Sequence, residues 1–187
     1  MKQYRDILLL CALIFASRIP FLFSGYGSEE DAWGLILTAR KIDINGVYEV
    51  SRMPGHPVQE YLLSLIWNWP SWILNLLTAI VSSAGIGLFM ASLKKLGVMH
   101  YREAGIALAF VPAVYLNSSN VMDYTWAMAI TMLSFMLCIR QKPVAAGIVL
   151  GLAAGFRITA LGMAVPFALL FMMHDNKRDS IRNTVMF

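Results

Sequence analysis

The sequence has few charged residues and almost no cysteine. Only 14% of its 187 residues are Asp, Glu, Lys or Arg, and 58% are hydrophobic. A soluble globular domain has about a quarter charged residues, so this composition excludes a disordered chain, a basic nucleic-acid-binding domain and an ordinary cytosolic enzyme. Cys11 and Cys138 both lie inside apolar runs, which indicates neither a disulfide framework nor a zinc site. The composition is that of an integral membrane protein with no nucleic-acid partner.

Long apolar runs are what the sequence has instead. A membrane-spanning helix needs about 20 mostly apolar residues, and shorter runs can serve inside a bundle. The last run is too long for one span at about 1.5 Å per residue, and Gly155 and Arg157 lie in its middle, so we expect it to break there. The sequence therefore predicts an all-α, polytopic membrane protein with a single domain, 1–187. Its expected spans are 7–23, 72–93, 104–116, 124–139, 144–156 and 158–173.

The charged residues divide unevenly between the two sides of this expected bundle. With the N-terminus inside, ten of the 15 Lys and Arg residues and four acidic residues fall on the inner side, against five basic and seven acidic residues outside. This bias follows the positive-inside rule. It predicts a multi-pass plasma (inner) membrane protein with a cytoplasmic N-terminus. The first apolar run has no A-x-A-like cleavage site, so we expect it to be a retained span.

The expected outer connection 24–71 is far longer than an ordinary loop. Loops of this length are usually functional or disordered, and its many Trp, Tyr, Leu and Ile residues argue against disorder. Its pattern predicts two interfacial helices, over 32–44 and 58–67, with an extended segment and a turn at Gly55 between them. The loop is therefore expected to be folded on the outer surface.

Ionisable residues converge at that surface. Glu29, Glu30 and Asp31 follow the first expected span, Asp123 begins the fourth, and Arg157 lies at the tip between the fifth and sixth. Such groups at membrane depth are energetically expensive and usually mark a functional pathway. Each also has a simpler interpretation: a solvated acidic face, an N-cap for Asp123 and a snorkelling Arg157. Taken together, acids and an arginine beside a structured loop favour a site.

Other polar and small residues have structural interpretations. Arg18, just below the outer surface, is expected to pair with an acid or to snorkel. His56 is a lone histidine in a Pro-Gly-His-Pro turn. A histidine in this setting is more often structural than catalytic. Gly147, Gly151 and Gly155 have the small-xxx-small spacing that favours close helix packing.

Several short motifs follow one another in a familiar order. A first span ending in SRIPFLF leads to the acidic motif, the helix AWGLILTARKI, the turn RMPGHP, and then NVMDYTWAMA and GLAAGFRITAL. This order resembles the glycosyltransferase-C superfamily, polytopic enzymes that take a sugar from a polyprenyl-phosphate carrier. It is most similar to the protein O-mannosyltransferase and lipid A aminoarabinose transferase branch. Members are usually far longer, so the resemblance predicts an N-terminal fragment or a reduced member.

The resemblance also implies roles for the candidate residues. A carboxylate of the acidic motif is expected to act as general base toward an acceptor hydroxyl. Members commonly carry Asp-Glu where this chain has Glu-Glu-Asp, so the expected base is Asp31 or, alternatively, Glu30. Arg157 is expected to neutralise the charge of the leaving lipid phosphate. The remaining candidate substrate-binding residues are Arg52, Asp123, Glu29 and His56.

The expected partners follow from these roles. They are a polyprenyl-phosphate-linked sugar donor, a glycan, lipid or protein acceptor, and the lipid bilayer, with the active face periplasmic or extracellular. No cofactor is expected, although Glu29 and Asp31 could together bind a divalent cation. The alternative function is a non-catalytic scaffold or a transporter-like subunit of an envelope-polysaccharide system. Transporters place polar groups near mid-membrane, whereas these acids lie at the outer surface, which favours chemistry on a lipid-linked substrate.

Overall fold

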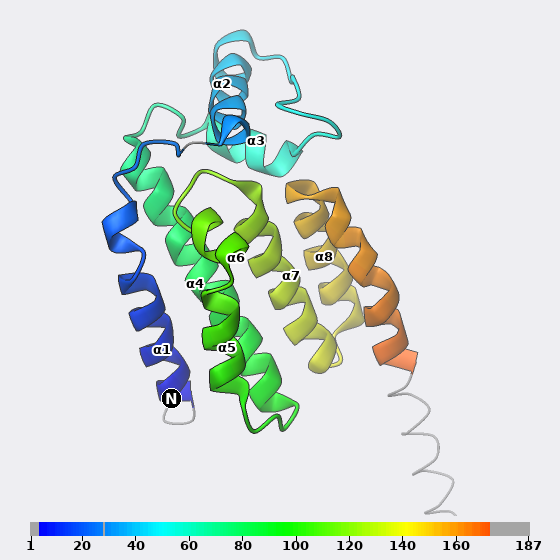
Figure 1. The fold of residues 1–187 in the computed structure, drawn as a ribbon. Helices are drawn as coiled ribbons and strands as arrows, with labels where there is room; N and C mark the ends of the chain where they lie inside the picture. The colour runs from blue at the N-terminus through cyan, green and yellow to red at the C-terminus, as the bar shows by residue number, and fades with distance from the viewer. Residues whose placement is uncertain (1–3, 28, 173–187) are drawn as a thin grey trace, which may run out of the picture.

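The computed structural model describes residues 4–27 and 29–172, and these residues form helices joined by turns and loops, with no strand among them (Figure 1). The expected all-α class is therefore confirmed for this part of the chain. Position 173, which ends the expected sixth span, lies outside it. The helices are α1 (Arg5–Ala16), η2 (Ile19–Phe21), α2 (Glu30–Asn45), α3 (Pro57–Ser64), α4 (Ser71–Lys95), α5 (Tyr101–Ala109), α6 (Pro112–Asn117), α7 (Asp123–Ile139), α8 (Pro143–Phe156) and η3 (Ile158–Met163), whose helix continues to Met172.

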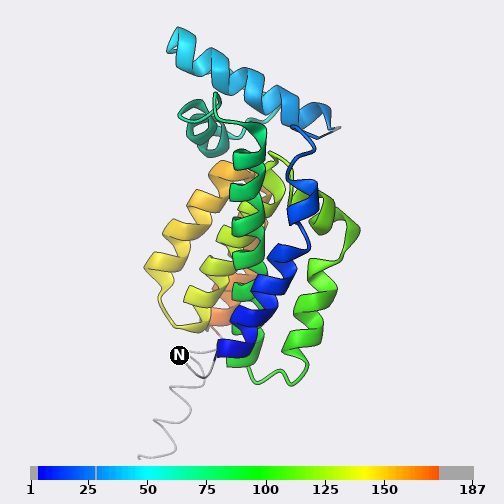
Figure 2. The same cartoon turned by 90° about the vertical axis from the view of Figure 1, so that its left-hand side faces the viewer.

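These helices form two layers. The bundle contains α1, α4, α5, α6, α7, α8 and the last helix, and α2 and α3 lie across one end of it (Figures 1 and 2). Two helices are thus present in the connection 24–71, as expected, and we call α2 and α3 together the outer layer. Gly46 ends α2 with φ +66°, a left-handed conformation that glycine adopts without strain. The second helix is shorter than expected, because α3 ends at Ser64.

The helix lengths differ from the six expected spans. Among the described residues, α4 is the one helix that is long and apolar enough to cross a membrane, while α7, α8 and the last helix are shorter and apolar. The expected span 104–116 is wrong as a single helix, since α5 ends at Ala109 and α6 begins at Pro112. Proline has no N–H to donate and its ring disfavours helical geometry at the preceding residue, here Val111, which explains the break.

The break expected near Arg157 is confirmed. Arg157 has extended backbone angles, φ −156° and ψ 112°, between the end of α8 and the start of η3. Of the three glycines with small-xxx-small spacing, Gly155 packs closely, since an added Cβ there would lie 2.3 Å from Cγ2 of Val58 on α3. Gly147 and Gly151 have no atom within 4 Å of such a Cβ, so the expectation of close packing is wrong for these two. α3 docks on α8 through Gly155.

An apolar cluster fixes the outer layer to the bundle. It joins one face of α2 to α3, to the start of α4 and to the segment that precedes α7. Full burial of a side chain such as leucine contributes about 1.5–3 kcal/mol, so this cluster holds α2 firmly in one rotation about its axis. Its buried members are Ala32, Leu35, Ile36, Ala39, Leu63, Leu74, Val121 and Met122.

Candidate functional site

The centre of the candidate site is the buried carboxylate of Asp123, at the start of α7. Its side chain is fully buried, and it accepts hydrogen bonds from Nη2 of Arg52 at 2.6 Å and from Nη1 of Arg157 at 2.8 Å. The N-cap interpretation of Asp123 is wrong, because Met122 occupies the N-cap position and the carboxylate binds the two arginines instead. A carboxylate is tolerated at such depth only when it is paired in this way.

Arg52 connects this centre to the outer layer. Its Nη1 forms an ion pair with the carboxylate of Asp31 on α2, while its Nη2 binds Asp123. The result is a row of alternating charges, Asp31, Arg52, Asp123 and Arg157, which we call the charge row. Its two ends are open: 41% of the Asp31 side chain and 30% of the Arg157 side chain are exposed. A carboxylate and a guanidinium are therefore both accessible at the same end of the bundle.

His56 joins the charge row to the end of α8. Nε of Arg52 donates to Nε2 of His56 at 2.9 Å, so Nδ1 must carry the ring hydrogen. That nitrogen lies 2.8 Å from the carbonyl oxygen of Phe156 and donates to it, and it is 3.5 Å from Oδ2 of Asp123. The ring is buried and each nitrogen has a partner, an arrangement typical of the structural role expected for it.

Glu60 is a member of this region that sequence reasoning missed. It is fully buried on α3, and its carboxylate accepts hydrogen bonds from the Tyr48 hydroxyl at 2.6 Å, from the backbone N–H and hydroxyl of Ser51 at 2.7 and 2.6 Å, and from the backbone N–H of His56 at 3.2 Å. These donors all belong to residues 48–56, the segment that carries Arg52. An acid within the mostly apolar run VQEYLLSLIW, four residues after His56, was the signal for it.

The environment of Glu60 changes its acidity and that of its neighbour. Burial by itself raises the pKa of a carboxyl group, but the hydrogen bonds from Ser51, Tyr48 and His56 outweigh burial and hold the pKa of Glu60 below its ordinary value. Burial, followed by the bond to Glu60, raises the pKa of the Tyr48 hydroxyl. Glu60 therefore carries a negative charge at neutral pH and fixes the loop around it.

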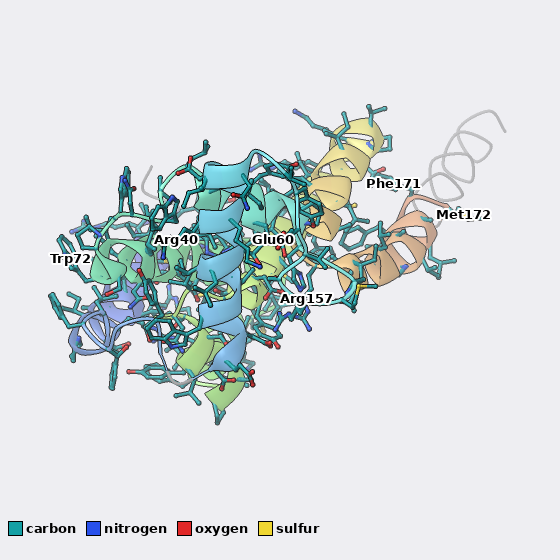
Figure 3. The ribbon with its side chains drawn as sticks, turned by 90° about the horizontal axis from the view of Figure 1, so that it is seen from above. Arg40, Glu60, Trp72, Arg157, Phe171 and Met172 are labelled. Atoms are coloured by element: carbon teal, nitrogen blue, oxygen red, sulfur yellow. The ribbon has the colours of Figure 1, made fainter. Side chains whose placement is uncertain are left out.

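The other two acids of the expected motif lie apart from the charge row. Glu29 and Glu30 are exposed at the start of α2, and neither has a hydrogen bond or ion pair with any described side chain. The interpretation as a solvated acidic face thus fits these two residues, while Asp31 has an arginine partner. Figure 3, which looks down on α2, shows Glu60 and Arg157 on the opposite side of that helix from Arg40.

Arg18 differs from both of its expected states. It is fully buried, and no carboxylate of the described residues lies within ion-pair distance of it. Its guanidinium donates to Oγ of Ser118 at 3.1 Å and to the carbonyl oxygens of Ile14 and Ala109, and it lies 4.3 Å from the ring centroid of Tyr115. Arg18 therefore ties α1 to α5 and α6, beneath the site and separate from the charge row.

The comparisons add no relative to these observations. No family model, curated protein or solved structure matches the chain. Within residues 4–27 and 29–172, no group of three or more His, Cys, Asp or Glu side chains has the arrangement that a metal ion needs. What the geometry provides is an accessible carboxylate at Asp31, an accessible guanidinium at Arg157, and Arg52 and Asp123 linking them.

Proposed function

We propose that this chain is a membrane glycosyltransferase of the glycosyltransferase-C type, which moves a sugar from a polyprenyl-phosphate carrier to an acceptor hydroxyl. The observation that carries the proposal is the charge row, which has an open carboxylate at Asp31 and an open guanidinium at Arg157. Transfer of a sugar from a phosphate needs a base for the attacking hydroxyl and positive charge for the departing phosphate. The two ends of the charge row supply one of each.

The second part of the proposal is that the bundle lies in the bilayer, with α2 and α3 on its outer surface. Support comes from large apolar side chains on the outside of the bundle. Leu8 and Leu13 on α1 and Val144 and Ile148 on α8 expose between 65% and 76% of their surface. Apolar side chains exposed to this degree on two helices of the bundle suit contact with lipid. Trp69 and Trp72, between the layers, suit the membrane boundary.

In the proposed reaction, Asp31 takes the proton from the acceptor hydroxyl as its oxygen attacks the anomeric carbon of the sugar. The bond between that carbon and the phosphate oxygen breaks, and the phosphate leaves with the electron pair. Arg157 stabilises the departing phosphate, since Nε and Nη2 of Arg157 make no hydrogen bond within the described residues. Arg52 holds Asp31 and supplies a second positive charge.

We propose that these two arginines, and not a divalent cation, take up the charge of the phosphate. Arg52 already pairs with the Asp31 carboxylate, whereas the side chain of Glu29, the second ligand of the alternative cation site, is exposed and makes no contact there. Arginine suits a phosphate because its planar fork donates two hydrogen bonds in a fixed geometry.

A hollow beside α2 offers space for an acceptor. This hollow of about 430 Å³ lies between α2 and the extended segment before Arg52, and its lining includes Gly34, Thr38 and Ser51. Gly34 is three residues from Asp31 along the same helix, and Ser51 precedes Arg52. The hollow therefore lies within one helical turn of the proposed base along α2.

The test is donor cleavage by the full chain, purified in detergent and supplied with a panel of polyprenyl-phosphate sugars. Released polyprenyl phosphate reports cleavage whatever the acceptor is. We expect Asp31→Asn to lose activity by about 10²-fold or more, because general-base catalysis contributes about 10²–10⁴-fold. Glu30→Gln tests the alternative base and should stay close to wild type, because Glu30 is exposed and makes no ion pair with the charge row. Binding of the donors without cleavage of any would contradict an enzyme and favour the scaffold function.

A further inference from the structure

Tyr124 contacts the same two arginines as Asp123. It follows Asp123 in the first turn of α7, and the Cζ atom of Arg157 lies 4.0 Å from the centroid of its ring. The Cζ atom of Arg52 lies 5.6 Å from the same centroid. Both distances are within about 6 Å, the range of a cation–π interaction. Two consecutive residues thus hold both guanidiniums, Asp123 through hydrogen bonds and Tyr124 through its ring.

The Tyr124 ring is not part of the buried core. Tyr124 exposes 36% of its surface, and its hydroxyl makes no hydrogen bond with any described residue. A second tyrosine–arginine contact in the protein differs in these respects. Tyr115 lies against the fully buried Arg18, and its hydroxyl donates to the carbonyl oxygen of Ser17 at 2.9 Å. The Tyr115 contact is internal packing, whereas the Tyr124 contact lies at the open end of the charge row.

Arg157 needs such support because little else fixes its guanidinium. Its backbone is extended between two helices, and one hydrogen bond, from Nη1 to Asp123, holds one corner of the group. A ring against the face of the guanidinium limits rotation about that corner. A long side chain that is ordered before binding loses less freedom when it binds, and so binds more tightly.

We propose that Tyr124 is a positioning residue for the lipid phosphate: its ring orients the guanidiniums of Arg157 and Arg52 so that the unused N–H groups of Arg157 face the anion. This inference rests on the proposed function, which supplies the phosphate. Tyr124 acts through the two arginines and has no part in proton transfer. The ring carries the effect, and the hydroxyl does not.

The test measures the dissociation constant of decaprenyl phosphate for the full chain in detergent. Tyr124→Leu removes the ring, Tyr124→Phe keeps it without the hydroxyl, and Tyr115→Leu removes the tyrosine that contacts Arg18. We expect Tyr124→Leu to bind about tenfold more weakly, which is the effect of losing a partly desolvated cation–π contact. Tyr124→Phe and Tyr115→Leu should bind with an affinity within about twofold of wild type, because neither variant removes the ring that contacts Arg157.

Each other outcome overturns the inference in a distinguishable way. Wild-type affinity in Tyr124→Leu would show that the ring has no role. Equal weakening in Tyr124→Phe and Tyr124→Leu would assign the effect to the hydroxyl. Wild-type protein that does not bind decaprenyl phosphate would overturn the proposed function as well. If Tyr124→Leu does not fold, Tyr124→Met provides an unbranched replacement, for which the same tenfold weakening is expected and wild-type affinity is the contrary result.

Discussion

Arg52 and Asp123 are 71 residues apart in the sequence, and Nη2 of Arg52 donates a hydrogen bond to Oδ1 of Asp123 at 2.6 Å. Arg52 comes from the loop of the outer layer, and Asp123 comes from the first turn of a bundle helix. This contact therefore joins the two layers of the molecule at the place where the proposed chemistry occurs. Its loss should affect stability and activity together.

The first prediction concerns the charge of Asp123. Asp123→Asn leaves Arg52 and Arg157 without their shared carboxylate partner, and breaking a buried charge pair costs about 3–5 kcal/mol. We expect the free energy of unfolding of the detergent-solubilised protein to fall by about that amount, as measured by denaturant titration. Glu30→Gln, which removes an exposed and unpaired acid, should leave it unchanged. Equal stability of the two variants would show that Asp123 is not the anchor of the charge row.

The second prediction concerns the pH dependence given by Glu60. Its pKa is lower in the folded protein than in the unfolded chain. Its contribution to stability is therefore complete above the ordinary glutamate pKa of about 4.3 and is lost as the pH falls through the folded-state pKa. We expect the wild-type unfolding temperature to drop as the pH is lowered below about 4.3, and Glu60→Gln to show a smaller drop.

A matched control for Glu60 is Glu49, whose ion pair with Lys41 lies on the surface. Glu49→Gln should cost less than about 1 kcal/mol at neutral pH, because exposed ion pairs contribute little. Glu60→Gln should cost about 1–3 kcal/mol there, because its amide group faces N–H and O–H donors that then lack an acceptor. Similar losses in the two variants would mean that Glu60 does not organise the loop.

The third prediction compares two glycines of α8. Gly155→Ala places a methyl group 2.3 Å from Cγ2 of Val58, so α3 must shift, and overpacking of this kind costs about 1–3 kcal/mol. Gly151→Ala meets no atom within 4 Å and should be neutral or stabilising by up to about 1 kcal/mol, since alanine favours a helix. Thermal unfolding of both variants measures the difference. The reverse order of stabilities would contradict the docking of α3 on α8.

The fourth prediction tests the proposed position in the membrane. Asn45, at the end of α2, and Met99, in the turn between α4 and α5, are both exposed and lie at opposite ends of the bundle (Figure 1). We expect Asn45→Cys to react with a membrane-impermeant maleimide in intact cells, and Met99→Cys to react only after lysis. Both variants are made in a protein whose native Cys11 and Cys138 are replaced by alanine, so that the introduced cysteine alone reacts. Labelling of both positions in intact cells would contradict the proposed topology.

The local features of this protein were predictable from its sequence. The all-helical class, the two helices of the outer layer and the break at Arg157 each depend on residues within one or two helical turns. The break before Pro112 has an equally local cause, although the apolar run around it was interpreted as one span. Local sequence determines where helices begin and end because backbone sterics and hydrogen bonding act over a few residues.

The composition of the site was decided by tertiary structure. Glu30 and Asp31 are adjacent in sequence, and Asp31 meets Arg52 because α2 buries its Ala32, Leu35 and Ala39 face and so fixes its rotation. The burial of Arg18 without a carboxylate arose in the same way, from the packing of α1 against α5 and α6, whereas Glu60 takes its four donors from the neighbouring segment 48–56. Sequence alone supplied the charged residues, and only the docking of the outer layer on α7 and α8 determined which of them pair. The physical reason is that an ion pair depends on distance in space, and residues far apart along the chain gain that proximity only through the packing of the whole fold.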